Sequence, residues 1–93
     1  METSKSSGNT KSRNPRRKRL FIHLNNDDIN SFEYVKHVLM SICGHNAIQA
    51  ESCAMLVHGT GSTIITSGFS PEIFHIYSQL IKHGLSIEIK PKN

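Results

Sequence analysis

Residues 24–35, with the sequence LNNDDINSFEYV, place two adjacent carboxylates, Asp27 and Asp28, among amides and in front of a predicted helix. Asn and Asp side chains hydrogen-bond their own backbone and tolerate left-handed conformations, so the cluster is typical of a turn. Carboxylate and amide oxygens are also acceptors that can hold a metal ion or a positively charged group. These residues alone leave open a turn, a metal site and a socket for a cation.

A metal site needs further ligands at suitable spacing. Cys43, Cys53, His45 and His58 are the remaining candidates. The chain has no CxxC, no HxxxH and no EF-hand spacing, which argues against a zinc or calcium site. No pair of a nucleophile and a base stands out either. We therefore expect no metal, no other cofactor and no enzymatic activity.

The net charge of +4 is divided unevenly along the 93 residues. Residues 1–19 contain seven basic residues against one acidic residue, whereas residues 20–93 contain four basic against six acidic residues. After the first Met, the basic segment has no apolar side chain to bury, so burial cannot offset the entropy cost of ordering it. This predicts a disordered basic tail, residues 1–19, followed by a folded domain, residues 20–93.

The same division limits the partners. The cluster PRRKR at residues 15–19 could contact phosphates. The body, however, is acidic and has no Trp, which argues against nucleic acid as its partner. No apolar run is long enough for a membrane span or a signal peptide, so we expect no membrane partner and a cytoplasmic location.

Hydrophobic periodicity predicts alternating strands and helices in the body. Asn30 with Glu33, and Asn46 with Gln49, form capping-box patterns that mark helix starts. The expected elements are a strand at 19–24, a helix from Ser31, a helix over 47–57, a strand at 63–66, a helix with Ser70 as N-cap and Pro71 first, ended by Gly84, and a strand at 85–89. This βααβαβ order predicts one small α+β domain, with a three-stranded antiparallel sheet packed against three helices.

Two short motifs give the body a family resemblance. NDD at residues 26–28 follows the first strand, and VHGTG at residues 57–61 ends the second helix. Residues 20–61 resemble the ClpS adaptor family, whose members carry an NDD motif after a strand and a second helix that ends in VHxxG. Either motif alone is a weak signal, whereas the two at this separation are specific.

The resemblance implies an adaptor of the N-end rule pathway. ClpS proteins bind N-degron substrates, whose first residue is typically Phe, Leu, Tyr or Trp, and deliver them to the N-terminal domain of ClpA- or ClpC-type AAA+ unfoldases. By the same resemblance Asn26, Asp28 and His58 bind the free α-amino group, and Asp27 supports them. An α-ammonium offers three donors, which matches an amide oxygen, a carboxylate and a neutral imidazole. The stretch is then both a turn and a socket.

The resemblance also implies a pocket for the first side chain, between the first two helices. Its residues are Asn30, Phe32, Val35, Ala54 and, from the last strand, Leu85 or Ile87. Ordinary core packing is the alternative explanation, above all for Val35. Phe32 and Ala54 stand where many family members have Met, so the depth of the pocket and the preferred first residue stay open.

The third helix matches the part of the family that contacts the unfoldase. The matching positions are Glu72, Phe74 and Tyr77, and Tyr77 stands where Lys is common. Phe74, Tyr77 and Ile81 form a second apolar stripe, which indicates a more buried helix or a partner surface. Two alternatives therefore remain: a divergent ClpS-fold interaction module with a different partner, and a small nucleic-acid-associated protein that acts through its basic tail.

Overall fold

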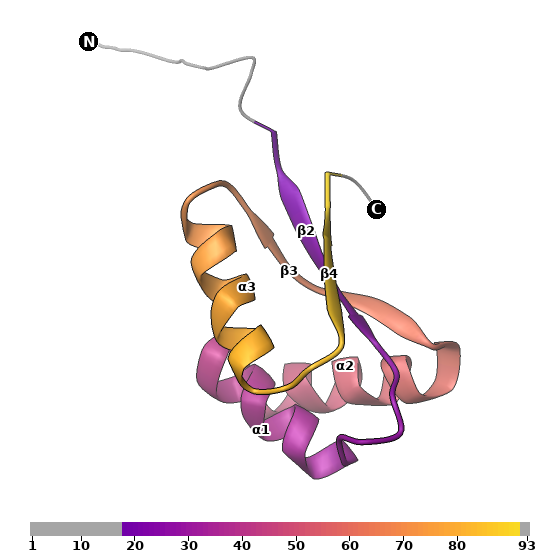
Figure 1. Ribbon diagram of the computed structural model, residues 1–93. Coiled ribbons are helices and arrows are strands. Elements are labelled where there is room, and N and C mark those ends of the chain that lie inside the picture. Colours follow the sequence, from indigo (N-terminus) through magenta and orange to yellow (C-terminus); the bar gives the residue numbers. More distant parts are fainter. Residues whose placement is uncertain (1–17, 92–93) are drawn as a thin grey trace, which may run out of the picture.

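The computed structural model describes residues 18–91, in which a three-stranded antiparallel sheet packs against three helices (Figure 1). The elements are β2 (Leu20–Asn25), α1 (Phe32–Ile42), α2 (Ala47–Thr60), β3 (Ser62–Gly68), α3 (Glu72–Lys82) and β4 (Ile87–Lys90). This confirms the predicted βααβαβ order and the α+β class. The helices described here are too short or too polar to cross a membrane.

Strand β2 is the centre of the sheet, between β3 and β4. Its side chains alternate as predicted: Ile22 and Leu24 are buried, whereas the residues between them are only half-buried. Because Phe21 pairs with Lys90 and Leu24 with Ile87, β2 and β4 run in opposite directions. The loop that follows β2 lies at the end of the sheet where α1 and α2 are found (Figure 1).

The start of α1 differs from the prediction because two adjacent residues, Asn30 and Ser31, can each act as the N-cap. Ser31, and not Asn30, is the N-cap of α1, and its hydroxyl accepts the N–H of Tyr34. The Asn30 side chain is used elsewhere, as described below. At the start of α2 the predicted capping box of Asn46 and Gln49 is confirmed.

Helix α2 continues to Thr60, one turn beyond the predicted end at Val57. Gly59 does not break it, since a glycine inside a helix costs only ~1 kcal/mol. The helix ends where Gly61 adopts a φ of 95°, a left-handed conformation that favours glycine. The extra turn keeps His58 on the helix.

Three further boundaries are corrected. Strand β3 covers residues 62–68 and not only 63–66, because its register with β2 continues past a bulge. Strand β4 begins at Ile87, since Leu85 and Ser86 belong to the turn after α3. Helix α3 begins at Glu72 with Pro71 as N-cap, so the predicted Ser70 cap is wrong by one position.

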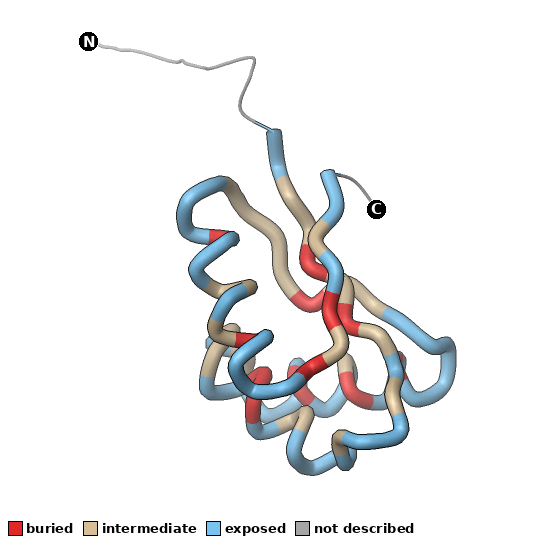
Figure 2. Tube along the Cα trace, in the orientation of Figure 1, coloured by how far each residue is buried: buried red, intermediate tan, exposed pale blue. Residues whose placement is uncertain are grey.

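The core lies where the strands face the helices (Figure 2). Its buried residues are Ile22, Leu24, Val38, Leu39, Ala50, Val57, Ile65, Ile73, Leu80, Leu85 and Ile87. The predicted second stripe of α3 is divided: Tyr77 packs against this core, whereas Phe74 and Ile81 are about half exposed, at 48% and 47%.

Two polar side chains attach connecting segments to β3. His45, in the turn between α1 and α2, lies with Nε2 2.8 Å from the carbonyl oxygen of Ile65, so this nitrogen is the protonated one. Arg19 donates to the Ser67 hydroxyl at 3.0 Å and lies 4.9 Å from the ring centre of Phe69. Arg19, assigned to the predicted tail, therefore contacts the body. Residues 1–17 of that tail lie outside the described part.

Candidate functional site

The loop between β2 and α1 is held together by the Asp27 carboxylate. Oδ1 accepts the backbone N–H groups of Ile29 at 2.9 Å and of Asn30 at 2.8 Å, and Oδ2 accepts from the Asn30 amide at 3.0 Å. The Asn30 N–H, its amide and the Ile29 N–H together lower the pKa of Asp27, against a smaller opposing effect of desolvation. Asp27 is thus the predicted turn residue, and its oxygens are already in use.

Replacing Asp27 by Asn is expected to destabilise the protein by about 0.5–1.5 kcal/mol at neutral pH, because one acceptor is lost. Since the folded-state pKa is lowered, this stability is fully present above the unfolded value of ~3.9. It is lost as pH falls through the lower folded value. Urea unfolding at pH 6 and pH 3 checks this: the difference between wild type and D27N should shrink at pH 3. An equal difference at both pH values would contradict it.

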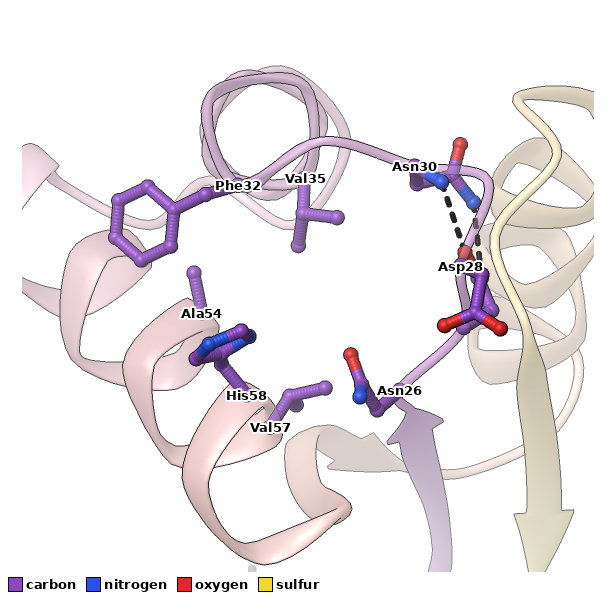
Figure 3. Close-up of a pocket in the computed structure, with 9 residues that line it drawn as sticks. Asn26, Asp28, Asn30, Phe32, Val35, Ala54, Val57 and His58 are labelled. Carbon is purple, nitrogen blue, oxygen red and sulfur yellow. Dashed lines mark hydrogen bonds between the residues drawn. The ribbon is translucent and has the colours of Figure 1, made fainter.

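A cavity of about 230 Å³ opens between this loop, α1 and α2 (Figure 3). It is lined by Asn26, Asp27, Asp28, Asn30, Phe32, Val35, Ala54, Val57 and His58. The structure therefore brings together eight residues that the sequence analysis assigned to one site. The exceptions are Leu85, which is not a lining residue, and Val57, which was not assigned.

Asn26 and Asp28 line the cavity from the loop, and His58 lines it from α2, across from Asp28 and next to Ala54 (Figure 3). Unlike Asp27, their side chains form no hydrogen bond or ion pair with any other residue in the range 18–91. A carboxylate, an amide and an imidazole thus stand beside the cavity with their acceptors unused. Among residues 18–91 no lysine or arginine lines the cavity, so these residues favour a positively charged group with several N–H donors.

Backbone contacts explain how these three side chains come to line one cavity. The N–H of Asn26 donates to the carbonyl oxygen of Gly61 at 2.8 Å, which joins the start of the loop to the end of α2. His58 lies in the last turn of α2, three residues before Gly61. The left-handed Gly61 therefore ends α2 and also receives the loop that carries Asn26 and Asp28.

The apolar lining residues are Phe32, Val35, Ala54 and Val57, of which Ala54 and Val57 lie next to His58 (Figure 3). Ala54 and Val57 are buried, at 4% and 5% exposure, and Phe32 is 38% exposed at the first residue of α1. Ala54 and His58 are four residues apart on α2, so they share one face of that helix. Val57, three residues after Ala54, borders this face, a spacing that could have identified it from the sequence.

Leu85 occupies a different place from the predicted one. It is 4% exposed and packs in the core cluster, in the turn that precedes β4. Ile87 is likewise a core residue. The prediction assumed that the last strand begins at residue 85 and reaches the pocket, whereas this turn closes the core and leaves the pocket to the loop and the two helices.

The other candidates for chemistry do not form a site. No group of three or more His, Cys, Asp or Glu within residues 18–91 is placed to hold a metal ion. Burial, with Cys53 nearby as the lesser cause, raises the pKa of Cys43 to about 11, so Cys43 stays a neutral thiol at pH 7. Glu72, Phe74 and Tyr77 lie on α3, away from the cavity, with Glu72 and Phe74 exposed.

Comparisons with known proteins identify the family and a similar fold. The model of the family described as "ATP-dependent Clp protease adaptor protein ClpS" matches residues 15–88. Among solved structures, that of Agrobacterium tumefaciens ClpS2 bound to L-phenylalaninamide is similar, with a TM-score of 0.69 and 20% sequence identity. The similarity covers 83% of this chain and 100% of that one. No curated protein sequence matches the chain at a significant level.

Proposed function

The chain belongs to the ClpS family of adaptor proteins of the ATP-dependent Clp protease, and we propose that it selects N-degron substrates by their first residue. In this proposal the cavity binds the free α-amino group together with a bulky apolar first side chain. The adaptor then delivers the bound protein to a Clp-type AAA+ protease. The chain itself catalyses no reaction.

The observation that carries the proposal is the combination of polar and apolar groups around one cavity. Asn26, Asp28 and His58 offer unused acceptors, and Phe32, Val35, Ala54 and Val57 supply apolar surface. A cation taken partly out of water must be paired, and of the two carboxylates among the described lining residues, Asp28 is the one that the loop does not already use. An N-terminal residue with a large apolar side chain carries both matching groups on adjacent atoms.

The ligand of the similar structure has the same two groups. Agrobacterium tumefaciens ClpS2 is bound to L-phenylalaninamide, which has a free α-amino group and an aromatic side chain. A cavity of about 150 Å³ can hold a benzene molecule. The cavity of about 230 Å³ in this chain therefore has room for a ring and for the ammonium beside it.

A panel of peptides that differ only in the first residue tests the proposal. Peptides beginning with Phe, Leu, Tyr or Trp should bind to the full-length protein, and those beginning with Ala, Ser or Asp should bind far more weakly. Fluorescence anisotropy with a dye at the peptide C-terminus measures this without altering the amino group. Equal binding of all first residues would contradict a role in N-degron selection.

For the unfoldase we propose contact through α3 and the basic N-terminal tail. Glu72 and Phe74 are exposed on α3, and Tyr77 is half-buried beside them. The N-terminal domain of a ClpA- or ClpC-type unfoldase is the proposed partner. The exposed Phe74 and Ile81 also fit the alternative of a different partner, which a binding assay with both unfoldases would distinguish.

Deleting residues 2–15 is expected to leave peptide binding unchanged and to impair delivery. The lining residues that the structure describes all fall between Asn26 and His58, so the deletion removes none of them. Affinity for a Phe-first peptide and degradation of a Phe-first protein by the unfoldase and its protease measure the two steps separately. A loss of peptide affinity greater than about tenfold, or ~1.4 kcal/mol, would instead place the tail in the binding site.

A further inference from the structure

The loop of the amine site is tied to the end of α3 by two side chains. The Nδ2 atom of Asn30 donates to Asp27 Oδ2 at 3.0 Å and to the carbonyl oxygen of Gly84 at 2.9 Å. An amide nitrogen has two hydrogens, so both donors of Asn30 are used. Asn30 lines the cavity, but its amide nitrogen is engaged by the protein itself and is not available to a ligand.

Tyr34 makes the second tie. Its hydroxyl donates to the carbonyl oxygen of His83 at 2.7 Å, and its backbone N–H donates to the Ser31 hydroxyl. Tyr34 thus connects the first turn of α1 to the residue just before Gly84. The carbonyl groups of His83 and Gly84 thus hold the segment from Asn30 to Tyr34 in place. They lie 49 and 54 residues further along the chain than the residues that donate to them.

The end of α3 is built to present these carbonyls. The last carbonyls of a helix have no partner within it. Here Gly84 takes a φ of 81°, and the N–H groups of Gly84 and Leu85 turn back to Ile81 and Leu80. The N–H groups of the turn are therefore bonded back to α3. Its carbonyl oxygens, those of His83 and Gly84, accept hydrogen bonds from Tyr34 and Asn30.

Asp28 lies between the residues that these ties fix. Asp27 on one side accepts three hydrogen bonds, and Ile29 and Asn30 on the other side donate to it. The Asp28 side chain itself has no partner among the described residues. Its direction toward the cavity therefore depends on the backbone of this loop.

We propose that Asn30 and Tyr34 are positioning residues that fix the Asp28 carboxylate for the substrate amine by anchoring its loop to the C-terminal turn of α3. The proposal rests on the proposed function for its ligand, but the anchoring itself is a property of the free protein. Because linkage is reciprocal, a bound peptide should in turn steady the α3 turn and slow amide exchange at Gly84 and Leu85.

Tyr34→Phe tests the anchoring, because it removes one hydroxyl and keeps the ring. In the full-length protein without ligand, the amide protons of Ile29 and Asn30 should exchange several times faster than in the wild type. Affinity for a Phe-first peptide should fall about fivefold, as for one lost hydrogen bond. Asn30→Ala removes both of its donors and should have the larger effect on both measurements.

Ser78→Ala is the matched control. The Ser78 hydroxyl donates to the carbonyl oxygen of His75 at 2.8 Å, so this variant also removes one hydroxyl bond to a backbone carbonyl of α3, away from the loop. It should change neither the exchange of Ile29 and Asn30 nor peptide affinity. A merely structural role of Tyr34 would make the two variants alike.

The results separate the two proposals. Unchanged exchange at Ile29 and Asn30 in Tyr34→Phe would overturn the positioning role, and so would weaker binding without faster exchange. If the wild type bound no Phe-first peptide, the proposed function would fail. The exchange measurements on the free protein would then decide the anchoring alone.

Discussion

Acetylation of the α-amino group is expected to lower the affinity of a Phe-first peptide by roughly 30-fold to several thousandfold. The acetyl group removes the positive charge and two of the three donors, while the Asp28 carboxylate stays in the site without a partner. Loss of one partner of a desolvated charged hydrogen bond typically costs ~2–5 kcal/mol, and each ~1.4 kcal/mol is tenfold. Calorimetry with the free and acetylated forms of one peptide measures the difference.

The same reasoning applies from the side of the protein. Asp28→Asn keeps the shape of the side chain and removes its charge, so it should weaken binding of the free peptide nearly as much. Glu33→Gln is the matched control, because Glu33 is an exposed carboxylate in the first turn of α1 that does not line the cavity. His58→Ala should weaken binding by less, since a neutral acceptor is lost. Equal affinity for the free and acetylated peptides would refute the amine site.

Filling the cavity from α2 is expected to abolish the preference for a large first residue. Burying a Phe side chain contributes ~1.5–3 kcal/mol, so the wild type should bind a Phe-first peptide roughly ten- to a hundredfold better than an Ala-first peptide. Ala54→Phe places a ring in the space that the substrate would occupy, so this ratio should fall close to one. The dependence on a free amino group should remain, because Asn26, Asp28 and His58 are untouched.

Met55→Phe is the control for added bulk on the same helix. Met55 is 60% exposed and does not line the cavity, so a ring there meets solvent. This variant should keep the preference of the wild type, and urea unfolding should show that both variants are folded. If Ala54→Phe still preferred Phe-first peptides, the first side chain would have to bind elsewhere than in this cavity.

The sequence predicted which residues line the cavity better than it predicted the loop that supports them. Asn26, Asp28 and His58 could be brought together because two short motifs at a fixed separation carry them. The family resemblance separated Asp28 from Asp27, but the residues alone did not, since adjacent carboxylates look alike until their hydrogen bonds are seen. Asn30 was predicted as a helix cap for a good local reason, but Ser31 is an equally suitable cap and the carbonyl of Gly84 is 54 residues away.

For the fold, local rules predicted the elements and tertiary contacts changed their ends. The alternation in β2 and the capping box at Asn46 both depend on neighbouring residues, and both are confirmed. The end of α2 depends on which of two glycines takes the left-handed conformation, and the structure selects Gly61, which also receives the Asn26 N–H. Leu85 was misplaced because its burial depends on the path of the turn after α3.

The contact between His45 and Ile65 has a consequence for solubility. Strands β3 and β4 are the two edges of the sheet, and an edge presents unpaired backbone groups to which another chain can add. Strand β4 is short and carries the charged residues Glu88 and Lys90, 3.6 Å apart, which discourage such pairing. Strand β3 is longer and has neither a charge nor a proline.

On β3, pairing with another chain is hindered by a bulge in the strand and by a side chain from outside it. The bulge near Ile65 interrupts the regular register, and the His45 imidazole occupies the carbonyl oxygen of Ile65 at 2.8 Å. An incoming strand would have to displace the turn between α1 and α2 before it could pair there. This one histidine therefore helps to keep other chains, including a second copy of this adaptor, from adding a strand to its sheet.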